Sequence, residues 1–151
     1  MAYAKDTQVS QTASLLEIEN VLARYGADQF MYGKTGQYAV IGFVMSGRQV
    51  RITVPLPDKA DRQFWVTDTG RDRSESVALK EWEQACKQKY RALSLVVKAK
   101  LEAVEAGITT FEEEFMAHLV LPGGQTVGQR LLPEIDEAQR TGKMPPLLPH
   151  L

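Results

Sequence analysis

Cationic side chains recur along the segment from Cys86 to Lys100, and no other stretch of the chain points more directly to chemistry. One row of cations has spacings of seven, four and seven residues and consists of Lys80, Lys87, Arg91 and Lys98. On a helix these spacings place the charges along one line, where they could neutralise the phosphates of a nucleic acid. The same row would also form if the cations were the solvated side of an amphipathic helix. Both interpretations stay open.

Aromatic residues stand among basic residues in residues 56–76, which indicates a second part of the same surface. Proteins that bind single-stranded nucleic acids combine a positive groove with aromatic rings, and each stacked base contributes about 1–3 kcal/mol. The candidate phosphate contacts are Arg48, Arg51, Arg62, Arg71, Arg73, Lys87, Arg91 and Lys98, and the candidate stacking residues are Tyr32, Phe64 and Trp65. In the competing interpretation the aromatic pair caps a sheet and the arginines are solvated.

The charge is distributed unevenly, although the net charge is only −1. Residues 34–100 carry 13 cations and 7 anions, whereas residues 101–151 carry 3 cations and 8 anions. A locally positive surface can attract a polyanion even on a near-neutral protein. The acidic block of one subunit could equally contact the basic middle of another, so we expect a homo-oligomer.

Recognisable motifs for catalysis, metals or cofactors are missing from the sequence. Residues 33–35 read GKT, but a phosphate-binding loop requires a glycine at the position of Asp28 and a helix afterwards. His118 and His150 are 32 residues apart without a second histidine or cysteine close to either, which argues against a structural zinc site. The single cysteine, Cys86, is expected to be a core residue. We therefore expect a protein that is not an enzyme and uses no cofactor.

The elements that would position these residues begin with an amphipathic helix, predicted by the helical spacing of Leu15, Ile18, Val21 and Leu22. Ser14 is suited to cap this helix, with Glu17 as the second member of a capping box, and Gly26 is suited to end it. Residues 1–12 are polar and lack periodicity, so we expect a flexible N-terminal arm.

Residues 28–57 predict a three-stranded antiparallel meander, because aromatic and β-branched residues alternate there with glycine-containing turns. If Ser46 and Gly47 form a two-residue hairpin loop, the facing residues follow directly. The pairs are Phe43 with Val50, Ile41 with Ile52, and Ala39 with Val54. All of these residues are apolar and share one face, which supports this register.

Residues 56–76 are mainly polar and predict a long excursion with one extra strand near Trp65. From Ser76 to Ala106, apolar residues recur at steps of three or four, which predicts one long helix that ends at Gly107. Its apolar stripe should lie across the apolar face of the sheet. The stripe consists of Leu79, Trp82, Cys86, Tyr90, Leu93, Val97, Leu101 and Val104.

The C-terminal part predicts a short helix capped by Thr110, a small hairpin in residues 118–128, and a helix with Pro133 in its first turn and Gly142 after its end. The chain is thus expected to be α+β, with the long helix covering the meander. Three regions are expected: the flexible arm at 1–12, a single domain at 13–142, and an extended proline- and leucine-rich tail at 143–151.

The order of these elements resembles the core of phage-type single-strand annealing proteins of the RecT and Redβ kind. The resemblance covers roughly residues 14–106 and concerns element order and charge placement: a helix (LLEIENVLARYGA), a meander (QFMYG, QYAVIGFVM, RQVRITVPLP) and a long basic helix (KEWEQACKQKYRALSLVVKAKLEAV). It implies an oligomeric ring or filament that holds single-stranded DNA along a basic groove for pairing with its complement. Residues 107–151 have no counterpart in this resemblance.

Two functions from different classes remain open. The first is binding of single-stranded nucleic acid, with single-stranded DNA as partner and annealing or recombination as the role. For this function we predict that Arg51→Ala combined with Arg91→Ala lowers DNA affinity without lowering thermal stability. The second is a non-enzymatic protein-interaction factor, such as an accessory or inhibitor protein of a phage or mobile element.

The sequence also bears on membranes and location. No apolar run approaches the roughly 20 residues that span a bilayer. The N-terminus lacks the charged and then apolar pattern of a signal peptide. We therefore expect no membrane partner and a cytoplasmic location.

Overall fold

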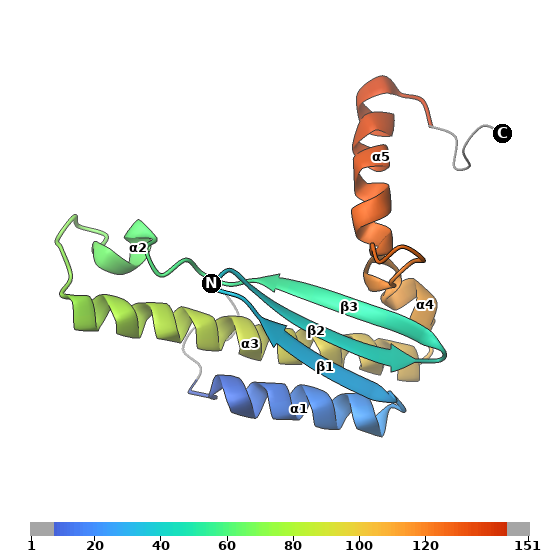
Figure 1. The fold of residues 1–151 in the computed structure, drawn as a ribbon, viewed down its shortest axis with the longest axis horizontal. Coiled ribbons are helices and arrows are strands. Elements are labelled where there is room, and N and C mark those ends of the chain that lie inside the picture. The colour runs from blue at the N-terminus through green and yellow to red at the C-terminus, as the bar shows by residue number, and fades with distance from the viewer. Residues whose placement is uncertain (1–7, 145–151) are drawn as a thin grey trace.

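The computed structural model describes residues 8–144. In chain order these form α1 (Gln11–Arg24), β1 (Gln29–Lys34), β2 (Tyr38–Met45), β3 (Arg48–Pro55), α2 (Arg62–Trp65), α3 (Glu75–Glu105), α4 (Phe111–Glu114), the short 3-10 helix η1 (Met116–His118) and α5 (Val127–Thr141) (Figure 1). Helices and a three-stranded antiparallel sheet confirm the predicted α+β class. Residues 1–7 and 145–151 lie outside the described residues, and with them most of the predicted arm and tail.

Helix α1 begins earlier than the sequence predicts. The hydroxyl group of Ser10, and not that of Ser14, caps it by accepting a 3.1 Å hydrogen bond from the amide of Ala13. Ser14 lies one turn into the helix, on the face that also carries Ile18, and is buried there. Both serines are suited to a cap by local chemistry, so the packing of Ser14 in the body decides between them. Residues 11 and 12, predicted as part of the arm, are helical.

The sheet has the order β1-β2-β3, and the predicted register between β2 and β3 is confirmed. The observed pairs include Phe43 with Val50, Ile41 with Ile52, and Ala39 with Val54. Ser46 and Gly47 form the turn with φ angles of 53° and 72°. Two positive φ angles are what a two-residue hairpin turn needs for its twist to match that of the strands.

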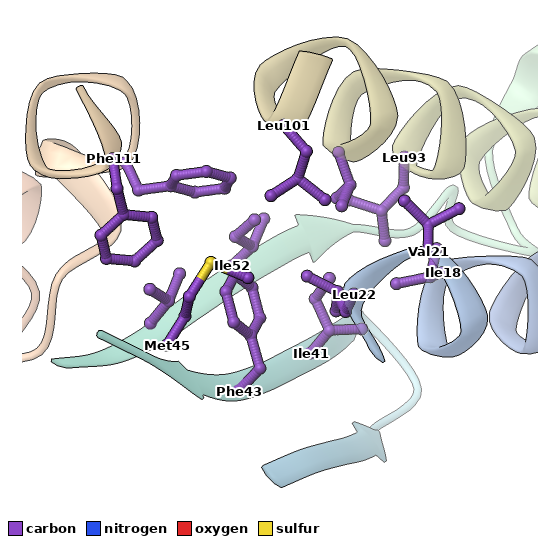
Figure 2. Packing of buried hydrophobic residues seen from close by; sticks show 13 residues of the cluster. Ile18, Val21, Leu22, Ile41, Phe43, Met45, Ile52, Leu93, Leu101 and Phe111 are labelled. Atoms are coloured by element: carbon purple, nitrogen blue, oxygen red, sulfur yellow. The ribbon is translucent and has the colours of Figure 1, made fainter. Parts of the chain in front are cut away.

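The core lies between one face of the sheet and the helices α1 and α3 (Figure 1). Figure 2 shows Ile41 and Phe43 of β2 on the side of the sheet that also carries Leu22 of α1 and Leu101 of α3. Burying one such side chain contributes about 1.5–3 kcal/mol, so this contact of three elements dominates the stability of the domain. The predicted stripe of α3 supplies the core through its C-terminal half, while Leu79 near its start is only partly buried.

The excursion between β3 and α3 contains a helix where the sequence predicts a strand. Residues 62–65 form the single turn α2, and an isolated bridge joins Val66 with Asp72. Asp61 caps α2 by accepting a 3.1 Å hydrogen bond from the amide of Gln63. A capping carboxylate so close to the aromatic pair favours the helical turn over an extended strand.

The elements after α3 are tied to the edge of the sheet. The predicted short helix is present as α4, whose cap Thr110 accepts a 3.2 Å hydrogen bond from the amide of Glu113. The predicted hairpin is reduced to an isolated bridge between Val120 and Thr126. A second bridge pairs Leu119 with Val50 of β3, so this segment starts at a defined place beside the sheet.

Helix α5 begins at Val127, so Pro133 lies inside it and not in its first turn as predicted. Thr126 and Gln129 form a capping box, in which each side chain accepts a hydrogen bond from the backbone amide of the other. The sequence prediction overlooked this box because proline is also favoured in a first turn. The helix ends before Gly142 as predicted and projects away from the sheet and α3 (Figure 1).

Candidate nucleic-acid interface

Arg51 lies on the outer face of the sheet, opposite Gly42, and its guanidinium group holds the start of α5. Its Nη2 donates to the carbonyl oxygen of Gly124 at 2.7 Å and to Oε1 of Gln129 at 3.0 Å. Gln129 is also a member of the capping box, so one guanidinium group supports both the turn and the helix. We therefore remove Arg51 from the candidate interface.

Arg48 and Arg91 also join elements of the fold. Arg91 of α3 forms an ion pair with Glu17 of α1, the residue predicted to belong to a capping box. Arg48 of β3 lies 3.4 Å from the carboxylate of Glu112 in α4. Both acidic partners come from outside the basic block at residues 34–100, so the neighbouring acidic segments neutralise part of it. Removing Arg51 and Arg91 together is now expected to lower thermal stability.

Some aromatic and basic residues of the excursion are buried or hydrogen-bonded within the fold, and others are exposed to solvent. Arg73 donates from Nη1 to the carbonyl oxygens of Gln63 at 2.8 Å and Phe64 at 3.2 Å. Phe64 is only 5% exposed, so its ring faces are closed to a base. Trp65 is partly buried, and its Nε1 donates to the carbonyl of Lys59 at 2.9 Å. Among the predicted contacts of this segment, Arg62 and Arg71 remain exposed.

A cluster of aromatic and lysine side chains forms where β1 and the segment after β3 meet the N-terminal half of α3. The hydroxyl groups of Tyr32 and Tyr90 are 2.7 Å apart and share a hydrogen bond. The ammonium group of Lys59 lies 4.7 Å from the ring centroid of Trp82. We call Tyr32, Lys34, Lys59, Trp82 and Tyr90 the aromatic–lysine cluster.

Cys86 of α3 connects the two sides of this cluster. Burial raises the pKa of its thiol, and the ammonium groups of Lys34 and Lys59 oppose that rise. Both lysines thus influence the same residue, Lys34 from β1 and Lys59 from the segment after β3. Burial and the hydrogen bond with Tyr32 raise the pKa of the Tyr90 hydroxyl group. Thiol and phenol are protonated at neutral pH, so the charge of the cluster comes from its lysines.

The cluster has one solvent-exposed aromatic ring, that of Tyr32, and two solvent-exposed cations, Lys34 and Lys59. Tyr32 is 40% exposed, whereas Tyr90 is buried and Trp82 is partly buried. Lys34 and Lys59 are exposed. The hydrogen bond to Tyr90 restricts the Tyr32 ring before any ligand arrives, which lowers the entropy lost on binding. Chemically, such a site can stack a planar base and pair with a phosphate.

Several other cations of the basic block are without a carboxylate within 4.0 Å in residues 8–144: Arg62, Arg71, Lys80, Lys87, Lys89 and Lys98. Their surroundings differ, because residues 56–90 contain 7 cations and 7 anions, whereas residues 34–55 contain 3 cations and no anion. Residues 91–100 also contain 3 cations and no anion. The positive excess therefore comes from the sheet and the C-terminal half of α3, and not from the excursion.

Lys34, Lys59, Trp82 and Tyr90 belong to the cluster but are missing from the predicted site, and the sequence assigns Tyr90 to the apolar stripe of the long helix. The sequence assigns Trp82 to the apolar stripe of the long helix, and its Nε1 does bind the carbonyl of Pro57 at 2.9 Å. The two lysines lie in separate segments that only the fold brings near Cys86. No local spacing could have identified them together.

Residues 8–144 contain neither a candidate metal-binding group nor a candidate membrane-spanning helix. No group of three or more histidine, cysteine, aspartate or glutamate side chains in this part of the chain is placed to hold a metal ion. None of its helices combines the length and the apolar character that crossing a bilayer requires.

Comparisons of the chain with known protein-family models, curated protein sequences and solved structures found no match. The resemblance to single-strand annealing proteins therefore continues to rest on element order and charge placement.

Proposed function

We propose that this protein is a non-catalytic, oligomeric protein that binds single-stranded nucleic acid through the aromatic–lysine cluster. The observation that carries the proposal is the exposed Tyr32 ring, held by Tyr90 and accompanied by the exposed cations Lys34 and Lys59. An aromatic platform beside cations is the combination by which proteins bind single strands without reading their sequence.

One subunit offers few contacts to a strand. The cluster supplies one open ring and two open cations, and each neutralised phosphate changes the salt dependence of single-strand binding by a slope of only about −0.7. A single subunit should therefore bind weakly. Several subunits along one strand would add their contacts, because later binding events become intramolecular. The proposed role is annealing or recombination of single-stranded DNA in the cytoplasm, in accord with the resemblance of residues 14–106.

A fluorescence-anisotropy titration of labelled oligothymidylate at low and moderate salt tests the proposal. Tyr32→Ala should weaken binding roughly ten-fold or more, because it removes one stacked base. Tyr32→Phe keeps the ring and loses the same hydrogen bond, so it is the matched control and should bind nearly as well as the native protein. Lys34→Gln and Lys59→Gln should each reduce the salt dependence, whereas Lys143→Gln at the far end of α5 should leave it unchanged.

Two results would count against this function. No salt-sensitive binding at micromolar protein would remove single-stranded nucleic acid as the partner. Equal affinities of Tyr32→Ala and Tyr32→Phe would remove the aromatic–lysine cluster as the interface, because the two variants differ only in the ring.

A second candidate function is a non-enzymatic protein-interaction factor, such as an accessory or inhibitor protein of a phage or mobile element. One observation favours it: the apolar residues of α5 remain open, with Leu132 58% and Ile135 45% exposed. A monomer that binds no nucleic acid in the titration above would favour this alternative.

A further inference from the structure

Helix α5 carries an apolar stripe that the described part of the chain leaves uncovered. Its residues are Leu131, Leu132, Ile135 and Ala138, and none of the residues of α5 is buried. An isolated helix of about 15 residues is marginal in water, because most helical stability in proteins comes from packing of an apolar face. We therefore expect another protein surface to pack against the α5 stripe.

The base of α5 is anchored to the domain at two places, which sets the direction of the helix. Arg51 bonds the preceding turn and Gln129. Gly128 lies so close to the neighbouring 3-10 helix that an added Cβ atom would be 3.0 Å from the carbonyl oxygen of Ala117. Only glycine permits this approach without a shift of the backbone. The stripe consequently projects from the domain (Figure 1) and is available to another molecule.

The stripe borders a groove of about 350 Å³ between α5 and the end of the body. Leu131, Leu132 and Ile135 line one side, and Met116 and Ala117 line the other. The lining is mainly apolar, so the apolar face of a helix would fit it better than a polar ligand.

Acidic side chains accompany the α5 stripe on both sides. Glu134 follows Leu131 by three residues, and Asp136 follows Leu132 by four, so each acid lies beside one edge of the stripe. Glu113 and Glu114 also line the groove. Arg130 forms an ion pair with Glu134 and Lys100 forms one with Glu114, so Asp136 and Glu113 are the acids here without an ion pair among residues 8–144. A partner with an apolar stripe and a cation that can reach Asp136 or Glu113 would therefore fit this surface.

Helix α3 carries such a stripe on the side that faces away from the sheet. Leu93 and Val97 enter the core, and residues two positions further along lie about 200° around the helix. This outer side consists of Ala92, Leu95, Val96 and Ala99, which we call the α3 outer stripe. Val96 is 48% exposed and Ala99 is exposed.

Lysines border the α3 outer stripe as acids border the α5 stripe. Lys89 precedes Val96 by seven residues and lies along one edge, and Lys98 follows Leu95 by three residues along the other. Both lysines are exposed, and neither has a carboxylate within 4.0 Å among residues 8–144. The two surfaces of the chain thus share an apolar stripe, and the unpaired lysines beside one are opposite in charge to Asp136 and Glu113 beside the other.

We propose that α5 of one copy docks its stripe against the α3 outer stripe of a second copy. Because the two surfaces differ, the contact is head-to-tail and repeats, which builds a ring if the rotation closes and a filament if it does not. This inference involves residues 107–151, which lie outside the resemblance to annealing proteins. It does not depend on nucleic-acid binding, since the contact is formed by protein alone.

Size-exclusion chromatography with light scattering, without nucleic acid, tests the contact with two variants. Ile135→Arg places a charge in the α5 stripe and leaves the α3 outer stripe unchanged. Val96→Arg places a charge in the α3 outer stripe and leaves the α5 stripe unchanged. The native protein should form assemblies larger than a dimer. Each variant alone should be monomeric, with self-association weakened about 100-fold or more, as for loss of a central interface residue. An equimolar mixture should form a one-to-one dimer, because each variant retains one functional surface.

Circular dichroism melting of both variants at low concentration controls for folding, since Ile135 and Val96 are exposed and their replacement should leave the domain intact. Asp136→Lys is a milder variant that preserves the apolar stripe and should weaken assembly by a smaller factor.

Each of the following outcomes would overturn the proposal. The native protein could be monomeric at high concentration, or either variant could assemble like the native protein. A mixture of folded variants that stays monomeric would show that the two stripes do not meet. Assembly and anisotropy are separate measurements, so failure of the docking leaves the result for single-stranded nucleic acid standing, and the reverse also holds.

Discussion

Helices α1 and α5 have similar amphipathic patterns, but only α1 buries its apolar face in the described structure. They contain 14 and 15 residues, each is capped by a hydroxyl side chain, and each carries apolar residues at helical spacing. The described chain buries Ile18, Val21 and Leu22 of α1 and no residue of α5. An amphipathic pattern thus identifies the apolar face of a helix. It does not identify the element or molecule that packs against that face.

The difference arises from the connections of the two helices. The turn after α1 leads directly into β1, so α1 packs beside α3 against the same face of the sheet (Figure 1). The turn before α5 is held on the opposite face of the sheet by Arg51. One helix completes the core, and the other is presented to solvent.

The largest expected effect tests this contrast directly. Ile18→Ala should lower the free energy of unfolding by about 2–5 kcal/mol, because it leaves a cavity in the core. Ile135→Ala should change it by at most about 0.5 kcal/mol, since that side chain is exposed. Urea denaturation at low protein concentration measures both values. Equal losses would mean that α5 is covered within the monomer and would remove the contrast.

The next effect concerns the polar anchor of α5. Arg51→Ala should cost about 1–2 kcal/mol, because two hydrogen bonds from a charged donor are lost. Arg51→Lys should lose most of this as well, since an ammonium group cannot reproduce the guanidinium geometry. Hydrogen exchange should show the loss first in the amides of α5. Arg62→Ala, at an exposed cation of α2, is the control, and a similar loss there would contradict a specific anchor.

A smaller effect is expected for the ion pair that anchors α1. Arg91 and Glu17 are 25% and 33% exposed in their side chains, so their coupling should be about 0.5–1 kcal/mol and should decline with salt. A double-mutant cycle with Arg91→Ala and Glu17→Ala in thermal denaturation measures it. A coupling near zero would leave α1 held by its apolar face alone, which sharpens the contrast with α5.

The smallest effect is a pH dependence at the groove beside α5. Burial, and secondly the charge of Lys100, lower the pKa of His118 from its usual 6.5. The unfolded chain then binds the proton more readily, so stability is fully present above about pH 6.5 and falls as the pH drops toward the folded pKa. Melting temperatures of the native protein and of His118→Gln between pH 7.5 and 5.5 should show a shallower decline for the variant. Identical slopes would mean that folding leaves the pKa of His118 unchanged.

Much of the fold follows from local residue patterns. The register between β2 and β3 could be derived from Ser46-Gly47 and the alternation of apolar residues, because a shift by one residue would expose the entire inner face. The end of α3 at Gly107 is equally local. The start of α1 was misplaced because Ser10 and Ser14 have the same capping chemistry, and packing chose between them.

The candidate site could be predicted only in part. Tyr32 was identified from the sequence and lies in the aromatic–lysine cluster, whereas its companions Lys34 and Lys59 were not identified. Phe64 has the residue type expected of a stacking platform, but the fold buries its ring. Residue type describes what a side chain can do, and exposure depends on elements distant in the sequence.

The sequence by itself determined the α+β class, the register of the hairpin, the long helix and the separation of basic and acidic blocks, because turn chemistry and apolar spacing act between near neighbours. The tertiary structure alone decided that Arg51, Arg73 and Arg91 stabilise the fold, that lysines remain open beside Tyr32, and that the stripe of α5 lacks a cover in the described chain. The physical reason is that the partner of a guanidinium group and the cover of an apolar face are supplied by residues far away along the chain.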